Sequence, residues 1–197
     1  MYGMEQFKHN KQSLEEEKRC LRQAVKSKFR AQNQEELNRQ NRIIEEKLES
    51  LSVYRDSRVV MFYWSMPGEV DTRSLIRKAE EMKKIIALPV IKDNNVMHPY
   101  QFSAGARTVN GPFGVLQPDI NSCVQVEAKD LDIVLVPAVA FDKQGRRLGR
   151  GNGYYDRFLD KLSARTCKIG LAFSFQFLDK LPFNPLQDRE VDAVISP

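Results

Sequence analysis

The apolar positions of the first fifty residues repeat with the spacing of α-helices. Residues 13–16 (SLEE) have the form of a capping box, and the apolar residues at positions 14, 21, 25 and 29 then share one helical face to about residue 31. Asn33 and Glu36 repeat this start signal, and apolar residues at positions 37, 44, 48 and 51 follow. The pattern predicts an amino-terminal pair of helices.

Later in the chain, short apolar runs rich in β-branched and aromatic residues predict strands. These runs cover residues 58–64, 85–91, 96–102, 131–136, 167–173 and 191–195. Pro89 favours an edge or a strand end for the second run, and the turn signal at residues 93–95 (DNN) predicts a hairpin with the third. Helical spacing predicts helices over residues 71–83 and 154–162, and the Gly- and Pro-rich residues 103–119 predict a loop.

Strands that alternate with helices predict an α/β fold. We expect a mainly parallel sheet with helices on both faces, a three-layer α/β/α arrangement, formed by residues 1–197 as a single domain. Ligands of such sheets bind at the carboxyl ends of the strands. A glycine-rich stretch at residues 145–153 follows the strand at 131–136 and falls at that end.

Composition narrows the class of protein. The 197 residues are 42% hydrophobic and 29% charged, which suits one globular domain. The longest apolar run, residues 133–141, is far shorter than a membrane span, and the first ten residues lack the apolar stretch of a secretory signal. The three cysteines lie far apart and predict no disulfide framework. We therefore expect a soluble cytoplasmic protein without a membrane partner.

Positive charge gathers around the glycine-rich stretch. Residues 142–168 contain eight basic and three acidic side chains, a net charge of +5 that equals the formal charge of the whole chain. The remaining residues are balanced. This distribution favours one local anion site over the broad basic surface of a nonspecific nucleic-acid binder.

The stretch GRRLGRGNGYYDRFL, residues 145–159, has the residue types of a polyphosphate site. Alternating glycines permit positive φ and a close approach of backbone amides to a ligand, and arginines add charge. The helix predicted to begin at Tyr154 directs unpaired amides toward the same place. The glycines match neither a dinucleotide-binding fingerprint nor a Walker A loop, so a glycine-rich turn with solvated arginines is the alternative.

Two cations of the first helix are also candidates. Lys18 falls within the apolar face of that helix, and Arg22 lies one turn further on. Either both side chains pass the core and reach water, or the pair extends to an anionic ligand.

Residues 136–159 (VPAVAFDKQGRRLGRGNGYYDRFL) resemble the signature of the 5-formyltetrahydrofolate cyclo-ligase family, in order and in spacing. Weaker resemblance covers residues 18–22 (KRCLR), residues 64–69 and Val191-Asp192-Ala193. The chain departs from the family pattern at Gln117-Pro118, where many members carry Glu-Pro, and at its last residues, where an acidic residue is expected. Both departures lie outside the glycine-rich stretch.

The resemblance implies ATP-dependent closure of 5-formyltetrahydrofolate to 5,10-methenyltetrahydrofolate, with release of ADP and phosphate. In this family the formyl oxygen is understood to be phosphorylated, after which N10 attacks the activated carbon and phosphate leaves. The reaction needs no protein nucleophile. The site then has to position two substrates and to neutralise the charge of the phosphoryl group.

The resemblance also implies roles for individual residues. Those expected at ATP are Lys18, Arg19, Cys20, Leu21, Arg22, Arg147, Leu148, Gly149, Arg150, Gly151, Asn152, Gly153, Tyr154 and Tyr155. Those expected at the folate are Arg22, Trp64, Glu69, Arg150, Gly151, Asn152, Gly153 and Tyr154. Lys18, Arg147, Arg150 and Tyr154 are the expected catalytic set, whereas Tyr155 is equally typical of a core residue.

Asp156 and Asp192 match the family's Mg²⁺ carboxylates, and magnesium commonly takes few protein oxygens together with substrate phosphates. Asp156 at the start of a helix is also typical of a cap or of a first-turn acid that stabilises exposed amides. Two other functions remain open: a nucleic-acid-binding module, and a nucleotide-binding regulator without catalysis. We expect the enzyme, as a monomer that binds 5-formyltetrahydrofolate and ATP and no nucleic acid.

Overall fold

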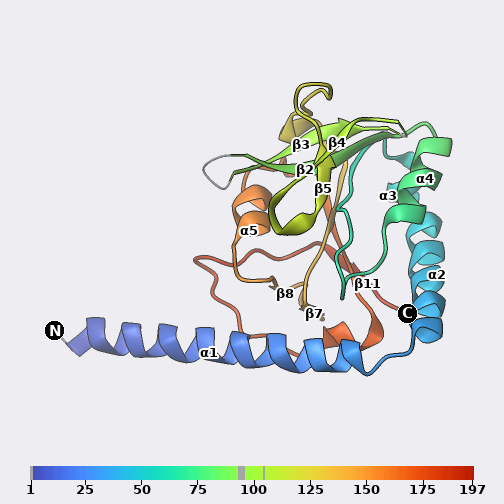
Figure 1. The fold of residues 1–197 in the computed structure, drawn as a ribbon. Coiled ribbons are helices and arrows are strands. Elements are labelled where there is room, and N and C mark those ends of the chain that lie inside the picture. Colours follow the sequence, from blue (N-terminus) through green and yellow to red (C-terminus); the bar gives the residue numbers. More distant parts are fainter. Residues whose placement is uncertain (1, 93–95, 104) are drawn as a thin grey trace.

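A computed structural model describes residues 2–92, 96–103 and 105–197. Its centre is a six-stranded sheet in the order β11-β9-β6-β1-β2-β3 (Figure 1). The strands are β1 (Val59–Met61), β2 (Ile85–Lys92), β3 (Val96–Phe102), β6 (Ile133–Val136), β9 (Cys167–Leu171) and β11 (Ala193–Ile195). Five of them run parallel, and β3 pairs antiparallel with β2. The predicted mainly parallel α/β fold is confirmed.

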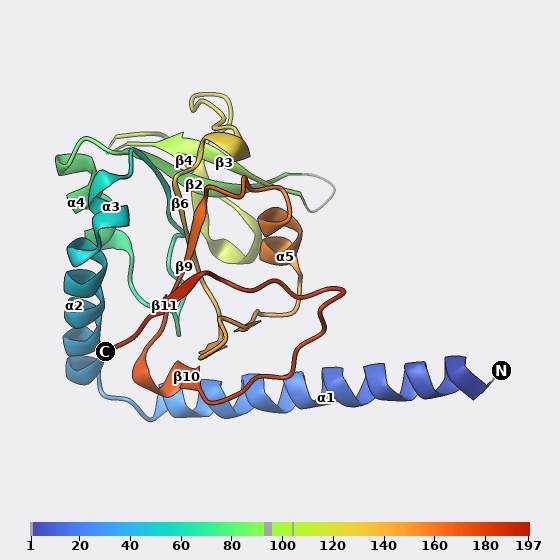
Figure 2. The same cartoon turned by 180° about the vertical axis from the view of Figure 1, so that it is seen from behind.

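Helices cover both faces of the sheet, as the sequence predicted. α2 (Gln34–Ser50), α3 (Ser52–Asp56) and α4 (Arg73–Glu81) lie on one face, and α5 (Tyr154–Leu159) lies on the other (Figures 1 and 2). Alternate residues of each strand enter different cores. Ile133 and Leu135 pack with α2 and α4, whereas Val134 and Val136 pack with α5. Side chains alternate between the faces of a strand, so one apolar strand supplies both layers.

α1 (Tyr2–Arg30) crosses one end of the sheet and extends beyond it (Figure 2). The predicted start at residues 13–16 is wrong, because the polar residues before Ser13 are good helix formers and the helix continues through them. The predicted start of α2 is confirmed: the Asn33 side chain accepts the Glu36 N–H at 2.7 Å.

Pro89 lies in the middle of β2, and β2 is an interior strand, so the predicted edge or strand end is wrong. β1 ends at Met61 opposite Ala87, so β2 continues beyond its parallel neighbour with β3 beside it. Pro99 of β3 lies directly opposite Pro89, so the two residues that lack a backbone N–H donor are paired with each other. The hairpin itself is confirmed, and its predicted turn at 93–95 lies outside the described residues.

Residues 103–119 contain more structure than the predicted loop. β4 (Thr108–Asn110) and β5 (Leu116–Pro118) pair antiparallel around the 3₁₀ turn η2 (Pro112–Gly114). A third sheet joins β10 (Phe177–Leu178), β7 (Ala140–Asp142) and β8 (Arg147–Leu148). Two further 3₁₀ turns are η3 (Ala128–Asp130) and η4 (Ser174–Gln176). Within the described part of the chain, every helix is too short or too polar to cross a bilayer.

The turn between β7 and β8 depends on Gly145. This residue has φ +77°, its carbonyl accepts the Val191 N–H at 2.8 Å, and a Cβ would overlap the Val191 carbonyl oxygen. The turn therefore joins the glycine-rich stretch to the carboxy-terminal segment.

We expect Gly145→Ala to destabilise the protein by more than about 2 kcal/mol, because left-handed strain of about 1–2 kcal/mol is added to a clash with backbone. Gly114→Ala is the matched control: its φ is +71°, but open space surrounds the new methyl group. Urea unfolding measures both variants. Equal losses would show that the Val191 contact contributes nothing.

Candidate active site

Two cavities meet at the carboxyl ends of the parallel strands. One contains residues that follow β1 and β6, including Tyr63, Trp64 and Pro137. The other lies between α1 and the carboxy-terminal segment. Both are lined by Arg147, Gly149, Asn152, Gly153 and Asp156. The glycine-rich stretch therefore forms the boundary between them, in the position predicted from the sequence.

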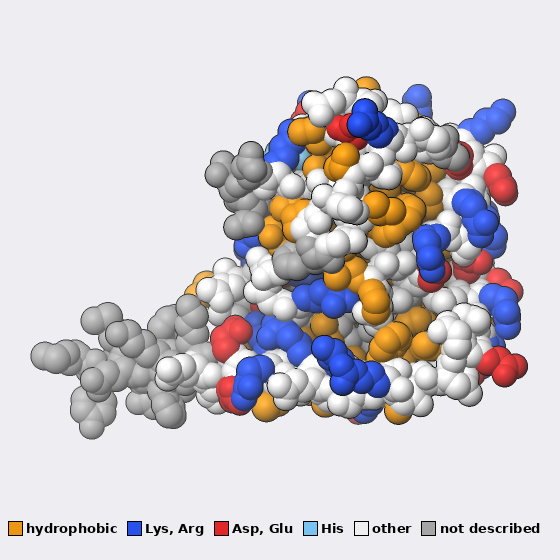
Figure 3. All heavy atoms as spheres, in the orientation of Figure 1, with side chains coloured by type: hydrophobic (Ala, Val, Ile, Leu, Met, Phe, Trp, Pro, Cys, Tyr) orange, Lys and Arg blue, Asp and Glu red, His pale blue; other side chains and the backbone are white. Residues whose placement is uncertain are grey.

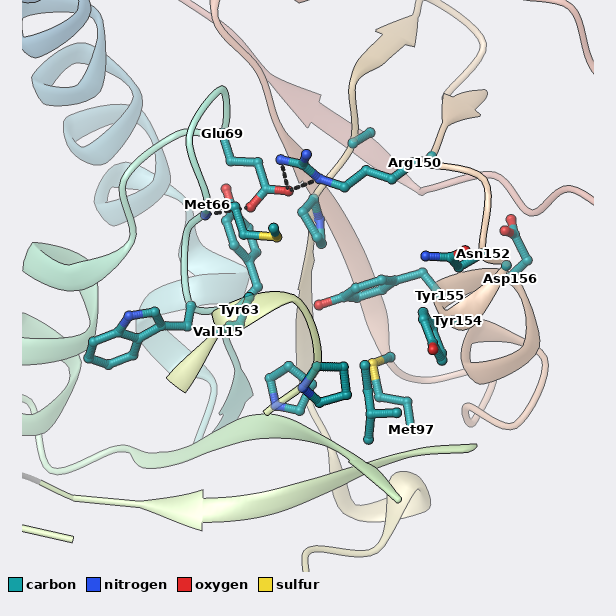
Figure 4. A pocket seen from close by; sticks show the side chains of 18 of the residues that line it. Tyr63, Met66, Glu69, Met97, Val115, Arg150, Asn152, Tyr154, Tyr155 and Asp156 are labelled. Atoms are coloured by element: carbon teal, nitrogen blue, oxygen red, sulfur yellow. Dashed lines mark hydrogen bonds and ion pairs between the residues drawn. The ribbon is translucent and has the colours of Figure 1, made fainter. Parts of the chain in front are cut away.

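The first cavity, here called the apolar cavity, has a volume of about 300 Å³ (Figure 4). Its walls come from the segments after β1 and β6, the β2–β3 hairpin with η2 and β5, and the glycine-rich stretch with the start of α5. Apolar and aromatic side chains predominate, and a few polar groups lie among them. Such a lining suits a flat organic ring system.

The second cavity, here called the charged cavity, has a volume of about 400 Å³. α1 contributes Glu15, Lys18 and Arg22, and the carboxy-terminal segment contributes residues 186–189. Figure 3 shows Lys and Arg side chains gathered where α1 meets the body of the protein. The cations suit an anionic ligand such as a polyphosphate.

The glycine-rich stretch has the backbone that its sequence predicted, with one exception. Gly151 and Gly153 have φ values of +111° and +65°. Gly149 does not have positive φ; its place is required by packing, because a Cβ would lie 2.8 Å from a guanidinium nitrogen of Arg147. α5 begins directly after Gly153.

Lys18 is buried, with 5% of its side chain exposed, so the alternative in which it reaches water is wrong. Its ammonium donates to both carboxylate oxygens of Asp188, at 2.6 and 2.8 Å. Arg22 donates from Nε to the Gly149 carbonyl at 2.8 Å, which links α1 to the glycine-rich stretch. α1 is held in place by Val25 and Leu21, which pack against β7 and β8.

Arg19 and Cys20 line neither cavity. Both are exposed, and Arg19 pairs with Glu16 on the outer face of α1. Leu21 is a packing residue. Of the five positions of the KRCLR motif, the structure therefore brings Lys18 and Arg22 into the site.

Arg147 and Asp156 form a buried ion pair at the boundary of the cavities. Nη2 of Arg147 donates to Asp156 Oδ1 at 2.6 Å, and 4% of the arginine side chain is exposed. The Arg189 N–H donates to the same oxygen at 3.1 Å. Asp156 is not a cap, because it lies in the first turn of α5 after Gly153 and its carboxylate binds these two groups.

Arg150 and Glu69 approach each other across the mouth of the apolar cavity (Figure 4). Arg150 Nε donates to Glu69 Oε1 at 3.0 Å, and the Met66 N–H donates to Oε2 at 2.9 Å. Burial raises the pKa of the Glu69 carboxyl above its usual value, against the lowering effect of these two partners. Glu69 and Trp64 thus line the cavity expected to hold the folate.

The adjacent tyrosines both line the apolar cavity. The Arg157 guanidinium lies 5.4 Å from the Tyr154 ring centroid and fixes one face of that ring. Tyr155 is absent from the lining of the charged cavity, and its ring also packs against the α5 core.

Asp192 is separated from Asp156. It lies at the amino ends of β9 and β11, where its carboxylate accepts the Lys168 N–H at 2.7 Å and pairs with the Lys168 ammonium at 3.1 Å. It lines neither cavity. The structure does not bring the two predicted Mg²⁺ carboxylates together.

Several lining residues escaped the sequence analysis. Asp188 and Arg189 lie in a Pro-rich segment without periodicity, and Pro89, Ile91 and Met97 read as ordinary strand residues. Gln117, noted as a departure from the family pattern, lines the apolar cavity and accepts the Ile91 N–H at 3.3 Å. Among the described residues, no three His, Cys, Asp or Glu side chains form a metal-binding cluster.

Comparison with known proteins decides the family. The sequence profile of the 5-formyltetrahydrofolate cyclo-ligase family matches residues 14–197. The chain belongs to this family. Membership in the 5-formyltetrahydrofolate cyclo-ligase family confirms the resemblance seen in the sequence, and with it the class of ATP-dependent ligases that act on folate.

Curated members of the family match over most of their length. A probable 5-formyltetrahydrofolate cyclo-ligase of Caenorhabditis elegans is 33% identical, over 93% of this chain and 94% of the relative. The 5-formyltetrahydrofolate cyclo-ligase of Mus musculus is 30% identical, over 90% and 92%. The solved structure of Aquifex aeolicus 5,10-methenyltetrahydrofolate synthetase superposes with a TM-score of 0.81 at 34% identity, covering 91% of this chain and 89% of that one.

The raised pKa of Glu69 predicts how pH affects stability. The folded protein holds this proton at pH values where the unfolded chain has lost it, so the contribution of Glu69 to the free energy of unfolding falls as pH rises above 4.5. We expect the wild type to lose stability relative to Glu69→Gln over this rise. Urea unfolding of both proteins at a series of pH values measures the difference. A wild type that instead gains stability relative to Glu69→Gln as pH rises would show that the Arg150 ion pair dominates.

Proposed function

We propose that this chain catalyses the ATP-dependent closure of 5-formyltetrahydrofolate to 5,10-methenyltetrahydrofolate, with release of ADP and phosphate. One observation carries the proposal within the family: an apolar cavity and a charged cavity share the glycine-rich stretch as a wall. Phosphoryl transfer to a formyl oxygen requires both substrates at one boundary. We further propose that the chain acts as one domain, as a cytoplasmic monomer, without nucleic acid.

ATP phosphates occupy the charged cavity in this proposal. Lys18 and Arg22 approach them from α1, and Arg147 approaches from β8. Each of these cations already has an oxygen partner: Asp188, the Gly149 carbonyl and Asp156. Their side chains are therefore oriented before a ligand binds, and phosphate oxygens add to or replace these partners.

The reduced pterin of the folate occupies the apolar cavity. Trp64 and Tyr154 supply aromatic surface, and the Glu69 carboxylate accepts hydrogen bonds from ring N–H groups. The formyl oxygen then lies toward Arg147 and Arg150, where it attacks the γ-phosphorus of ATP and ADP leaves. N10 attacks the activated formyl carbon and gives up its proton to water, and phosphate departs with the former formyl oxygen. Arg147 and Arg150 stabilise the negative charge on the moving phosphoryl group.

Magnesium fits the charged cavity through Asp156 and Asp188. Both hydrogen bonds of Asp156 among the described residues go to Oδ1, so Oδ2 is oriented for a cation. Asp188 lines the same cavity next to Arg189, which donates to Asp156, and its carboxylate is bound by Lys18. One or two carboxylates with substrate phosphates satisfy Mg²⁺, which when bound neutralises phosphate charge.

The activity itself is tested by mixing the protein with Mg²⁺, ATP and 5-formyltetrahydrofolate and following the near-ultraviolet absorbance of the methenyl product. We expect product only when all three are present, and phosphate release that requires the folate. A basic module that binds nucleic acid would show no turnover. Rapid ATP hydrolysis without folate would contradict phosphorylation of the formyl oxygen.

Asp156→Asn tests the cation site. Because the formal charge at Oδ2 is lost, we expect a raised Mg²⁺ requirement and a rate reduced about 10-fold or more at limiting Mg²⁺, which corresponds to about 1.4 kcal/mol. Asp192→Asn is the matched control, since Asp192 lines neither cavity, and its Mg²⁺ dependence should equal that of the wild type. A Mg²⁺ requirement raised equally in both variants would overturn the assignment.

A further inference from the structure

Tyr155 has the one hydroxyl of the apolar cavity whose hydrogen bonding is left open in the described structure. Its oxygen is buried and has no hydrogen-bond partner among the described residues. The ring crosses the cavity from α5, and its hydroxyl points into the enclosed space (Figure 4). The neighbouring Tyr63, on the opposite wall, donates its hydroxyl to the Val70 carbonyl at 3.0 Å.

A buried hydroxyl without a partner lowers stability, since water bonds to it in the unfolded chain. A phenylalanine would pack equally well here at no such cost. Orphaned polar groups of this kind call for a partner that the protein alone does not contain. Because the hydroxyl faces the cavity, its partner is to be sought among the molecules that bind there.

We infer that the Tyr155 hydroxyl donates a hydrogen bond to an acceptor atom on the bicyclic head of the substrate in the apolar cavity. This assignment rests on the proposed function and moves Tyr155 from the ATP-binding set to the substrate-binding set. Burial raises the pKa of the phenol far above its usual value, so the hydroxyl remains a neutral donor at every working pH.

The position of Tyr155 gives its hydrogen bond a second consequence. The Arg147 guanidinium lies 5.8 Å from the Tyr155 ring centroid, and Arg147 lines both cavities. A head group held by Tyr155 therefore lies beside the arginine that faces the phosphates. The hydroxyl selects substrates with an acceptor at this place over ring systems that lack one.

Tyr155→Phe tests the inference, with Tyr54→Phe as the matched control, because the Tyr54 hydroxyl is also buried without a partner among the described residues but lines neither cavity. We expect Tyr155→Phe to raise the KM for 5-formyltetrahydrofolate about 2- to 12-fold, the loss of one neutral hydrogen bond, with the KM for ATP unchanged. Its melting temperature should equal or exceed that of the wild type. Tyr54→Phe should likewise keep or raise the melting temperature, but it should leave the KM for folate at the wild-type value.

Calorimetric titration of 5-formyltetrahydrofolate into each protein without ATP gives a readout independent of turnover, and we expect the same loss of affinity in Tyr155→Phe. If the wild type is active and Tyr155→Phe has the same KM and affinity for folate, the inference is overturned while the proposed function stands. A raised KM for ATP in Tyr155→Phe, with the KM for folate unchanged, would show that Tyr155 binds the nucleotide. A wild type that neither binds nor converts the folate would overturn the proposed function and this inference together.

Discussion

The buried ion pair between Arg147 and Asp156 is the interaction on which the site depends. A guanidinium this deeply buried is stable only with its charge compensated, and removing one partner of such a pair commonly costs about 3–5 kcal/mol. Asp156 also accepts the Arg189 N–H, so the pair joins β8, the start of α5 and the carboxy-terminal segment. β8 and the start of α5 line both cavities, and the carboxy-terminal segment lines the charged cavity.

Paired charges recur around the same boundary. Lys18 is bound to Asp188 from the other end of the chain, and Arg150 is bound to Glu69 from the segment after β1. Lys18, Arg147 and Arg150 are each oriented by a carboxylate on another element, and Arg22 is oriented by the Gly149 carbonyl. Phosphate binding then requires little reorganisation of side chains, which is the condition for strong electrostatic stabilisation in a phosphoryl transfer.

Errors of the sequence analysis have a common cause. The helix start at residues 13–16 and the edge position of Pro89 both followed from a single local signal. The helix continues past the first signal, and neighbouring strands override the second. α1 continues because nothing in its polar amino-terminal residues stops it, and Pro89 is tolerated because β1 ends before it. Asp192 was chosen by motif alone, whereas its carboxylate binds Lys168 at the amino ends of the strands.

The sequence by itself determined the layers of the fold, the family, and the glycine-rich stretch with positive φ at Gly145, Gly151 and Gly153, because periodicity and backbone freedom are properties of contiguous residues. Tertiary structure alone decided that Asp188 meets Lys18, and that the β2–β3 hairpin and Tyr155 line the same apolar cavity. These contacts join residues up to 170 positions apart. Packing of the whole chain determines which of these residues meet, and the pattern of neighbouring residues in the sequence does not contain that information.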